Sequence, residues 1–121
     1  MHRPLAAALA AAVLALGPAG SAPAAGEPAA AAKVDSGEIA GARFAIANPP
    51  GEWNKNVLLL AHGFRPASAP LVADLDPERP FLKALLDEGW IVATTSYRRN
   101  GLIVGDAISD LDLLRAHIAG A

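Results

Sequence analysis

The sequence predicts an α/β fold with a mostly parallel sheet and a right-handed βαβ crossover. Two largely apolar segments, Val57–Leu60 and Trp90–Thr95, are the basis of this prediction. Continuous apolar character is typical of strands that are covered on both faces in a parallel sheet. Between these segments, apolar residues recur at helical spacing over Phe81–Leu86. A strand, a helix and a second strand in this order form a βαβ unit.

The composition of the chain excludes several function classes. Its 121 residues are enough for one domain, and a formal net charge of −2 provides no basic surface for nucleic acid. Because the chain has no cysteine, disulfides, thiolate nucleophiles and cysteine metal sites are excluded. The histidines His2, His62 and His117 are too far apart in the sequence to suggest a metal site. No cofactor is predicted, since the common phosphate-binding glycine motifs are also missing.

The N-terminus has the organisation of a secretory signal peptide. Met1–Pro4 is a short positive start, Leu5–Leu16 is an uninterrupted apolar run, and Ala22–Ala24 offers small residues for cleavage. We therefore predict a signal peptide over residues 1–24 and export to the periplasm or the extracellular space. A helix over the apolar run would be ~18 Å long against a ~30 Å hydrocarbon core, so no membrane span is expected after cleavage. An uncleaved anchor or a disordered alanine-rich tail is the alternative.

The segment after the signal peptide is rich in alanine, proline and glycine. Residues 25–37 are predicted to be a flexible linker, and residues 38–121 to be the folded domain. Within the domain, Gly41–Ile46 alternates between apolar and other residues, which is typical of a strand with one buried face. Pro49 and Pro50 end this strand, because proline cannot donate to a strand ladder.

The Val57–Leu60 strand leads into the sequence Ala61-His62-Gly63-Phe64. The glycine allows a sharp turn at the C-terminal end of the strand, where open α/β sheets bind their ligands. The loop that follows, from Arg65 to about Arg79, is longer than the ~2–6 residues usual for such a connection. A long loop at this edge of a sheet is either functional or a plain insertion.

Both helices have recognisable ends. Pro80 suits the first turn of the helix that precedes the second strand, and Gly89 suits its C′ position. In the last helix, apolar residues over residues 104–118 are predicted to fall on one face, with the charged residues on the wet side. Those wet-side residues include Asp106, Asp110, Asp112, Arg115 and His117. Gly120 ends this helix.

In this order the elements resemble the N-terminal half of an α/β-hydrolase. The similarity is carried by Ala61–Phe64, Glu88–Trp90, Ala93–Gly101 and Asp106–Leu111, and it covers roughly residues 39–118. The resemblance implies that the domain is the N-terminal part of a hydrolase domain. It also implies a partial α/β-hydrolase-type sheet, incomplete at its C-terminal side, in which the Val57 strand has an open apolar edge.

The resemblance also implies a site and a reaction. In the family a backbone N–H after this strand contributes to the oxyanion hole, and by motif position the donor here is the Phe64 N–H. His62 and Gly63 then shape the turn; His62 is not the catalytic base, because the family's histidine follows the nucleophile and the acid. The implied reaction is hydrolysis of a carboxylic-ester or peptide bond of a small-molecule substrate through a serine acyl-enzyme.

The missing nucleophile motif and the roles of two arginines leave alternatives open. No serine of the sequence stands in the G-x-S-x-G pattern of the nucleophile, so the chain by itself is expected to be inactive. The alternatives are a non-catalytic exported α/β binding module, the product of a truncated gene, and a flavodoxin- or response-regulator-like domain. Arg98 and Arg99 are candidates for binding a substrate carboxylate, and the alternative is an ion pair with Asp106 or another surface acid.

Overall fold

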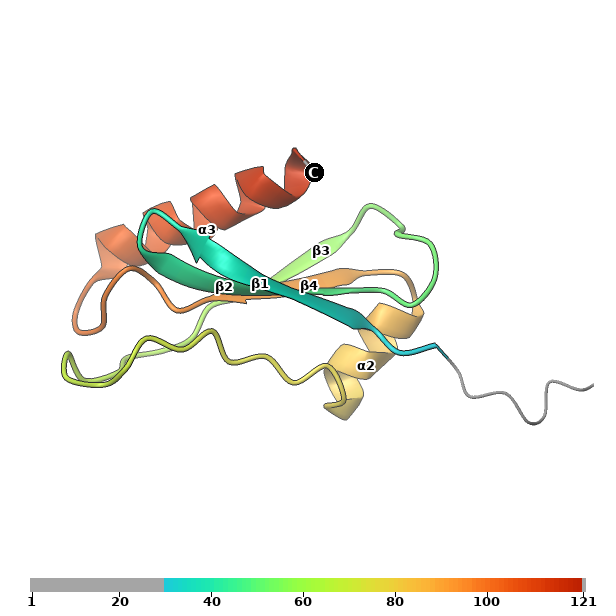
Figure 1. The fold of residues 1–121 in the computed structure, drawn as a ribbon, viewed down its shortest axis with the longest axis horizontal. Helices are drawn as coiled ribbons and strands as arrows, with labels where there is room; N and C mark the ends of the chain where they lie inside the picture. Colours follow the sequence, from blue (N-terminus) through green and yellow to red (C-terminus); the bar gives the residue numbers. More distant parts are fainter. Residues whose placement is uncertain (1–29, 121) are drawn as a thin grey trace, which may run out of the picture.

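The computed structural model describes residues 30–120 of the chain (Figure 1). The elements in order are β1 (Lys33–Ile39), β2 (Ala42–Asn48), β3 (Val57–Leu60), α2 (Pro80–Asp87), β4 (Ile91–Thr95) and α3 (Val104–Ala119). The predicted signal peptide and the start of the predicted linker lie outside the described residues. Within the described part, neither helix has the length and apolar character needed to cross a membrane.

The strands form a mixed four-stranded sheet in the order β1-β2-β4-β3. β1 pairs antiparallel with β2, and β2 pairs antiparallel with β4. The parallel pair is β3–β4, whose strands are connected through α2, as the sequence predicts for this unit. The prediction of a mostly parallel sheet of the α/β-hydrolase type is therefore wrong.

The β1–β2 hairpin is the physical reason for this difference. Ala40 and Gly41 connect the two strands with φ angles of +50° and +87°, the positive values that a two-residue type I′ turn requires. Such a turn makes the flanking strands antiparallel, with Ile39 opposite Ala42. Most residues of β1 are exposed, so this strand has no hydrophobic pattern. The predicted linker is consequently wrong for residues 33–37, which belong to β1.

The two helices cover opposite faces of the sheet (Figure 1). On the α3 face, Leu114 and Ile118 of the helix pack with buried residues of β2 and β4. On the α2 face, Leu82 and Leu86 pack with Val92 of β4 and with Ala47 of β2. Successive side chains of a strand point to opposite faces, so both central strands need apolar residues at consecutive positions.

β4, rather than β3, is the centre of the sheet. All five residues of β4 are buried, because β2 and β3 flank it and a helix covers each face. The four residues of β3 are only half-buried. Val57 and Leu59 contact the α3-side core and Leu58 and Leu60 contact the α2-side core, so both faces of β3 are apolar as predicted. Its exposure comes from its place at an edge of the described sheet.

Gly89 makes the short connection between α2 and β4 possible. Its φ angle is +103°, a left-handed value that L side chains rarely adopt. Its carbonyl oxygen accepts a hydrogen bond from the Asn54 N–H at 2.9 Å. A Cβ atom at this position would lie 2.8 Å from the Glu52 carbonyl oxygen. The loop before β3 therefore packs directly against the backbone of this turn.

We expect Gly89→Ala to lower the free energy of unfolding by about 1–3 kcal/mol, because alanine would be strained and would press on the Glu52 carbonyl. The matched control is Gly105→Ala in the first turn of α3, where an added Cβ meets no atom within 4 Å. Alanine is the better helix former, so the control is expected to raise stability by about 0.5 kcal/mol. Urea denaturation measures both, and equal stabilities of the two variants would contradict the assignment.

Candidate functional site

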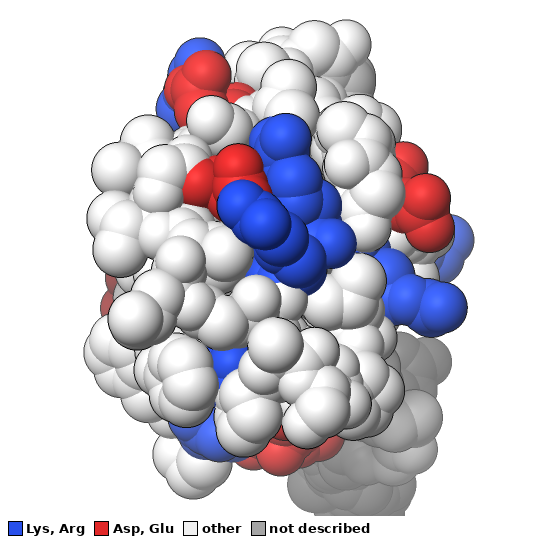
Figure 2. Space-filling view, turned by 90° about the vertical axis from the view of Figure 1, so that its left-hand side faces the viewer, with Lys and Arg blue, Asp and Glu red and all other residues white. Residues whose placement is uncertain are grey.

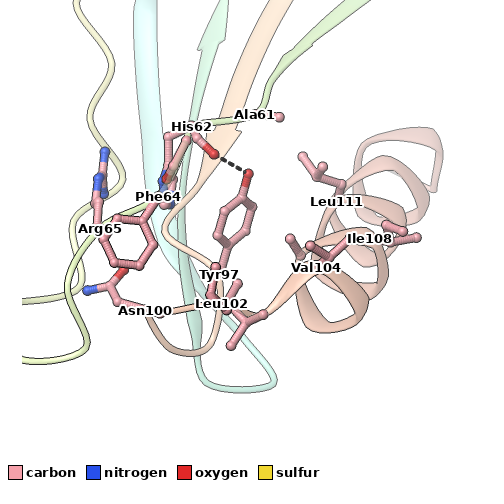
Figure 3. Close-up of a pocket in the computed structure, with 14 residues that line it drawn as sticks. Ala61, His62, Phe64, Arg65, Tyr97, Asn100, Leu102, Val104, Ile108 and Leu111 are labelled. Carbon is pink, nitrogen blue, oxygen red and sulfur yellow. Dashed lines mark hydrogen bonds between the residues drawn. The ribbon is translucent and has the colours of Figure 1, made fainter.

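Tyr97, from the loop that follows β4, braces the His62–Phe64 segment that follows β3. The sharp turn predicted at Gly63 is wrong, because residues 61–66 contain no turn or bend and Gly63 is not among the glycines with a positive φ angle. The His62 and Tyr97 rings stack with their centroids 4.1 Å apart. The Tyr97 hydroxyl donates a hydrogen bond to the His62 carbonyl oxygen at 2.8 Å (Figure 3). These contacts link two segments that are far apart in the sequence, and they hold the His62–Phe64 segment against the end of β4.

Both ring nitrogens of His62 face backbone carbonyl oxygens. Nε2 lies 3.1 Å from the Ser96 oxygen and Nδ1 lies 2.7 Å from the Gly63 oxygen. Carbonyl oxygens only accept, and a neutral imidazole has one N–H with which to donate. With both nitrogens turned toward the backbone, His62 presents no basic nitrogen to a substrate. Its contacts tie the segment after β3 to the loop after β4.

Tyr97 holds an unusual backbone conformation at this site. Its φ angle is +64°, although its side chain is large and only 4% of the residue is exposed. Its N–H donates to Thr95 Oγ1 at 3.0 Å, and its carbonyl oxygen accepts from the Ser96 hydroxyl at 2.7 Å. A left-handed conformation at a residue other than glycine costs on the order of 1–3 kcal/mol and persists only where surrounding contacts impose it. These hydrogen bonds and the His62 stacking supply such contacts.

Arg98 is engaged by a buried carboxylate inside the chain. Asp110 Oδ1 lies 2.7 Å from Arg98 Nη2, and Oδ2 accepts the Arg98 backbone N–H at 2.7 Å. The Asp110 side chain is 0% exposed, so its predicted place on the wet side of the last helix is wrong. The reason is that Arg98 turns back onto α3 and satisfies the carboxylate there. These hydrogen bonds raise the pKa of Arg98.

Arg99 is also in an ion pair within the chain. Its Nε lies 2.6 Å from Asp106 Oδ2. The alternative of a pair with Asp106 therefore describes Arg99, and Arg98 pairs with a buried acid instead. Neither guanidinium is left unpaired to receive a substrate carboxylate.

The predicted apolar face of the last helix divides into two parts. Leu114 and Ile118, in its C-terminal half, are buried against the sheet. Val104 and Ile108, in its N-terminal half, are 72% and 64% exposed. The first half of α3 projects beyond the sheet toward the loops that follow β3 and β4 (Figure 1).

A cavity of about 290 Å³ lies between these parts of the molecule. One side is the segment at residues 61–65, and the other is the loop after β4 with the first half of α3 (Figure 3). Its apolar lining includes Phe64, Leu102, Val104, Ile108 and Leu111. Figure 2 views this end of the molecule, where Lys and Arg side chains gather near the centre beside an acidic side chain and further charged side chains lie toward the edges.

Two polar groups of residues that line the cavity have no partner within the described part of the chain. No described residue accepts a hydrogen bond from the Phe64 backbone N–H. The Oδ1 atom of Asn100 is buried and has no hydrogen-bond partner within the described part of the chain. Sequence reasoning missed Asn100, because an asparagine before a glycine is read as a turn residue. Its place beside the cavity depends on how the loop folds.

Metal binding has no support in residues 30–120. No group of three or more histidine, aspartate or glutamate side chains comes together there in a way that could hold a metal ion. The two unpaired groups, a backbone N–H and a side-chain carbonyl oxygen, can pair with an oxygen acceptor and an N–H or O–H donor of a ligand.

Comparisons with family models, with curated proteins and with solved structures found no match for this chain. The functional assignment therefore depends on the chemistry of the cavity.

We expect Asp110→Ala to destabilise the protein by about 1–3 kcal/mol, because it leaves the Arg98 backbone N–H without an acceptor. Asp112→Ala is the matched control on the same helix, since the Asp112–Arg115 pair is exposed on both sides. Such a surface pair contributes at most about 1 kcal/mol. Thermal denaturation of both variants measures the difference. A smaller effect at Asp110 than at Asp112 would show that the buried pair does not hold the loop.

The brace at Tyr97 predicts a pH dependence. Burial raises the pKa of Tyr97 above its ordinary value of 10.0, and Arg65 opposes this only in part. The folded state therefore keeps the phenol proton more tightly than the unfolded state, and stability is expected to fall as the pH rises above 10. Tyr97 is the only tyrosine, so phenolate absorbance reports this group alone. The Tyr97→Phe variant should lose this part of the alkaline destabilisation. A tyrosine pKa that is lower in the folded protein than in the denatured protein would contradict the assignment.

Proposed function

We propose that the His62–Phe64 segment is the oxyanion-binding segment of an exported serine hydrolase that acts on carboxylic-ester or peptide bonds. The proposal starts from the resemblance of residues 39–118 to the N-terminal half of α/β-hydrolases. The observation that supports it most directly is the Phe64 N–H, which has no acceptor among the described residues and belongs to a residue lining an apolar cavity.

The chemistry asks for a donor that is held in place before the reaction begins. In acyl transfer, negative charge develops on the carbonyl oxygen of the tetrahedral intermediate, and fixed backbone N–H groups stabilise it. Loss of one such donor typically costs ~2.7–4 kcal/mol of transition-state stabilisation. The Tyr97 hydroxyl and the His62 stacking brace the segment that carries this N–H. A braced segment requires little reorganisation when the charge appears.

The proposal concerns half of a catalytic site. None of the serines in the sequence stands in G-x-S-x-G, and His62 presents both nitrogens to the backbone. The nucleophile, its base and the second oxyanion donor would have to come from outside these 121 residues. The chain alone is then a binding surface without a reacting group.

A second candidate function is a non-catalytic binding module. The cavity favours it, because apolar lining and an unpaired acceptor can recognise a ligand without any nucleophile. The two candidates differ in one requirement, since the hydrolase needs a serine supplied by additional sequence and the module does not.

The first test uses the purified chain. We expect no turnover of a p-nitrophenyl ester and no labelling by a fluorophosphonate probe, because no elbow serine is present. A serine of this chain that becomes labelled would contradict the placement of the nucleophile outside it. A secreted α/β-hydrolase of known activity serves as the positive control for the probe.

The decisive part of this test is the DNA that follows the Ala121 codon in the same frame. The hydrolase proposal expects it to encode a buried strand and G-x-S-x-G, and a frame without them contradicts it. In the protein that contains both parts, Phe64→Pro removes the N–H and is expected to lower kcat by about 10²–10³-fold. The matched control, Phe64→Leu, keeps the N–H and should retain kcat within a few-fold.

A further inference from the structure

We propose that the cavity beside the His62–Phe64 segment binds a small neutral apolar ligand that carries an amide N–H, and that this N–H donates to Asn100 Oδ1. The inference rests on the proposed function in treating this ligand as the substrate, and it selects amides among the ester and peptide substrates left open above. The binding itself requires no catalytic serine.

The orientation of the Asn100 side chain is determined by its surroundings. Its Nδ2 donates to the Ala69 carbonyl oxygen at 2.9 Å. Because a carbonyl oxygen only accepts, the NH₂ group must face Ala69, and Oδ1 must face the other way. In Figure 3 this oxygen points toward the ring of Phe64. The oxygen of this cavity-lining residue is therefore an acceptor, and the ring of Phe64 covers it.

The unpaired state of this acceptor is unusual. Asn100 is only 7% exposed, and Oδ1 has no hydrogen-bond partner within residues 30–120. Buried polar atoms in folded proteins nearly always have a partner, so an orphan acceptor beside a cavity indicates a place for a ligand donor. The Phe64 side chain, which covers this direction, is 67% exposed. Rotation of an exposed ring is fast and would open Oδ1 to the cavity.

The lining of the cavity determines the rest of the ligand. Leu102 and Val104 are 91% and 72% exposed, and Ile108 on the next turn of α3 is 64% exposed. Covering these side chains is favourable for a phenyl group or a short aliphatic chain. The volume of about 290 Å³ is at the small end for ligand sites. Arg65 is the one formally charged lining residue; it donates to the Val72 carbonyl oxygen at 2.8 Å and keeps its charge, and no other Lys, Arg, Asp or Glu lines the cavity.

An amide satisfies this site and an ester of the same shape does not. Both have a carbonyl oxygen for the Phe64 N–H, but only the amide has an N–H for Asn100 Oδ1. A site with an acceptor that awaits a donor discriminates against the analogue without it. For a ligand of this size the difference is expected to be about fivefold in Kd, the equivalent of one neutral hydrogen bond.

The test compares N-benzylacetamide with benzyl acetate, which have the same shape and differ in the N–H. The full chain labelled with ¹⁵N is titrated with each and followed by amide NMR spectra. We expect binding of N-benzylacetamide to be tighter by about fivefold. Shifts are expected in the Asn100 side-chain amide and in the Phe64 and Gly101 backbone signals. Equal affinities, no binding of either compound, or shifts confined to other parts of the molecule would overturn the proposal.

Two variants separate the acceptor from the apolar lining. Asn100→Leu keeps the branched outline of the side chain and removes both the acceptor and the donor to Ala69, so the preference for the amide should disappear. Leu102→Ser changes an exposed side chain and should weaken both compounds equally while the preference remains. If Asn100→Leu fails to fold, the ratio of the two Kd values, measured in the wild-type chain and in Leu102→Ser, still tests the proposal.

The outcomes are distinct from those of the hydrolase test. Amide-selective binding with no nucleophile encoded downstream would support the ligand and reject the hydrolase. If a nucleophile is encoded downstream and the amide and the ester bind equally, the proposed ligand is rejected and the proposed oxyanion site is not.

Discussion

The burial of β4 is the constraint on which the rest of this structure depends. A strand whose five residues are all buried must be paired along both edges and covered on both faces. β2 and β3 supply the pairing, and α2 and α3 supply the covering (Figure 1). Because consecutive side chains of β4 belong to opposite cores, a polar residue at Val92 or Ala93 would disrupt one of the two layers. The remaining elements are arranged around this requirement.

The candidate site is a consequence of how β4 ends. Its Thr94 hydroxyl donates to the Leu60 carbonyl oxygen at 2.8 Å, so the ends of β3 and β4 are held together. Just beyond, Tyr97 takes a left-handed conformation and stacks on His62. The chain then continues to Asn100 and into α3, whose first half extends past the sheet. The cavity lies between the segment that follows β3, the loop that follows β4 and the first half of α3.

Several parts of the fold could be predicted from local patterns. Pro80, Gly89 and the apolar spacing between them define α2 without any knowledge of its neighbours. β1 could not be predicted, because an exposed strand that contributes few core side chains has the composition of a linker. The location of Asp110 could not be predicted either. An acid between apolar helix positions is usually solvated, and only the return of Arg98 onto α3 makes burial of this carboxylate favourable.

The sequence by itself determined the two-sided apolar character of β3 and the helix between β3 and β4. These depend on residues that are neighbours in the chain, and periodicity and turn chemistry report on such neighbours directly. Only the tertiary structure decided the antiparallel pairs, the burial of Asp110 and the orphan oxygen of Asn100. These features depend on contacts between segments that are far apart in the sequence. The hydrogen bonds and the burial that favour such contacts produce no periodic pattern in the sequence.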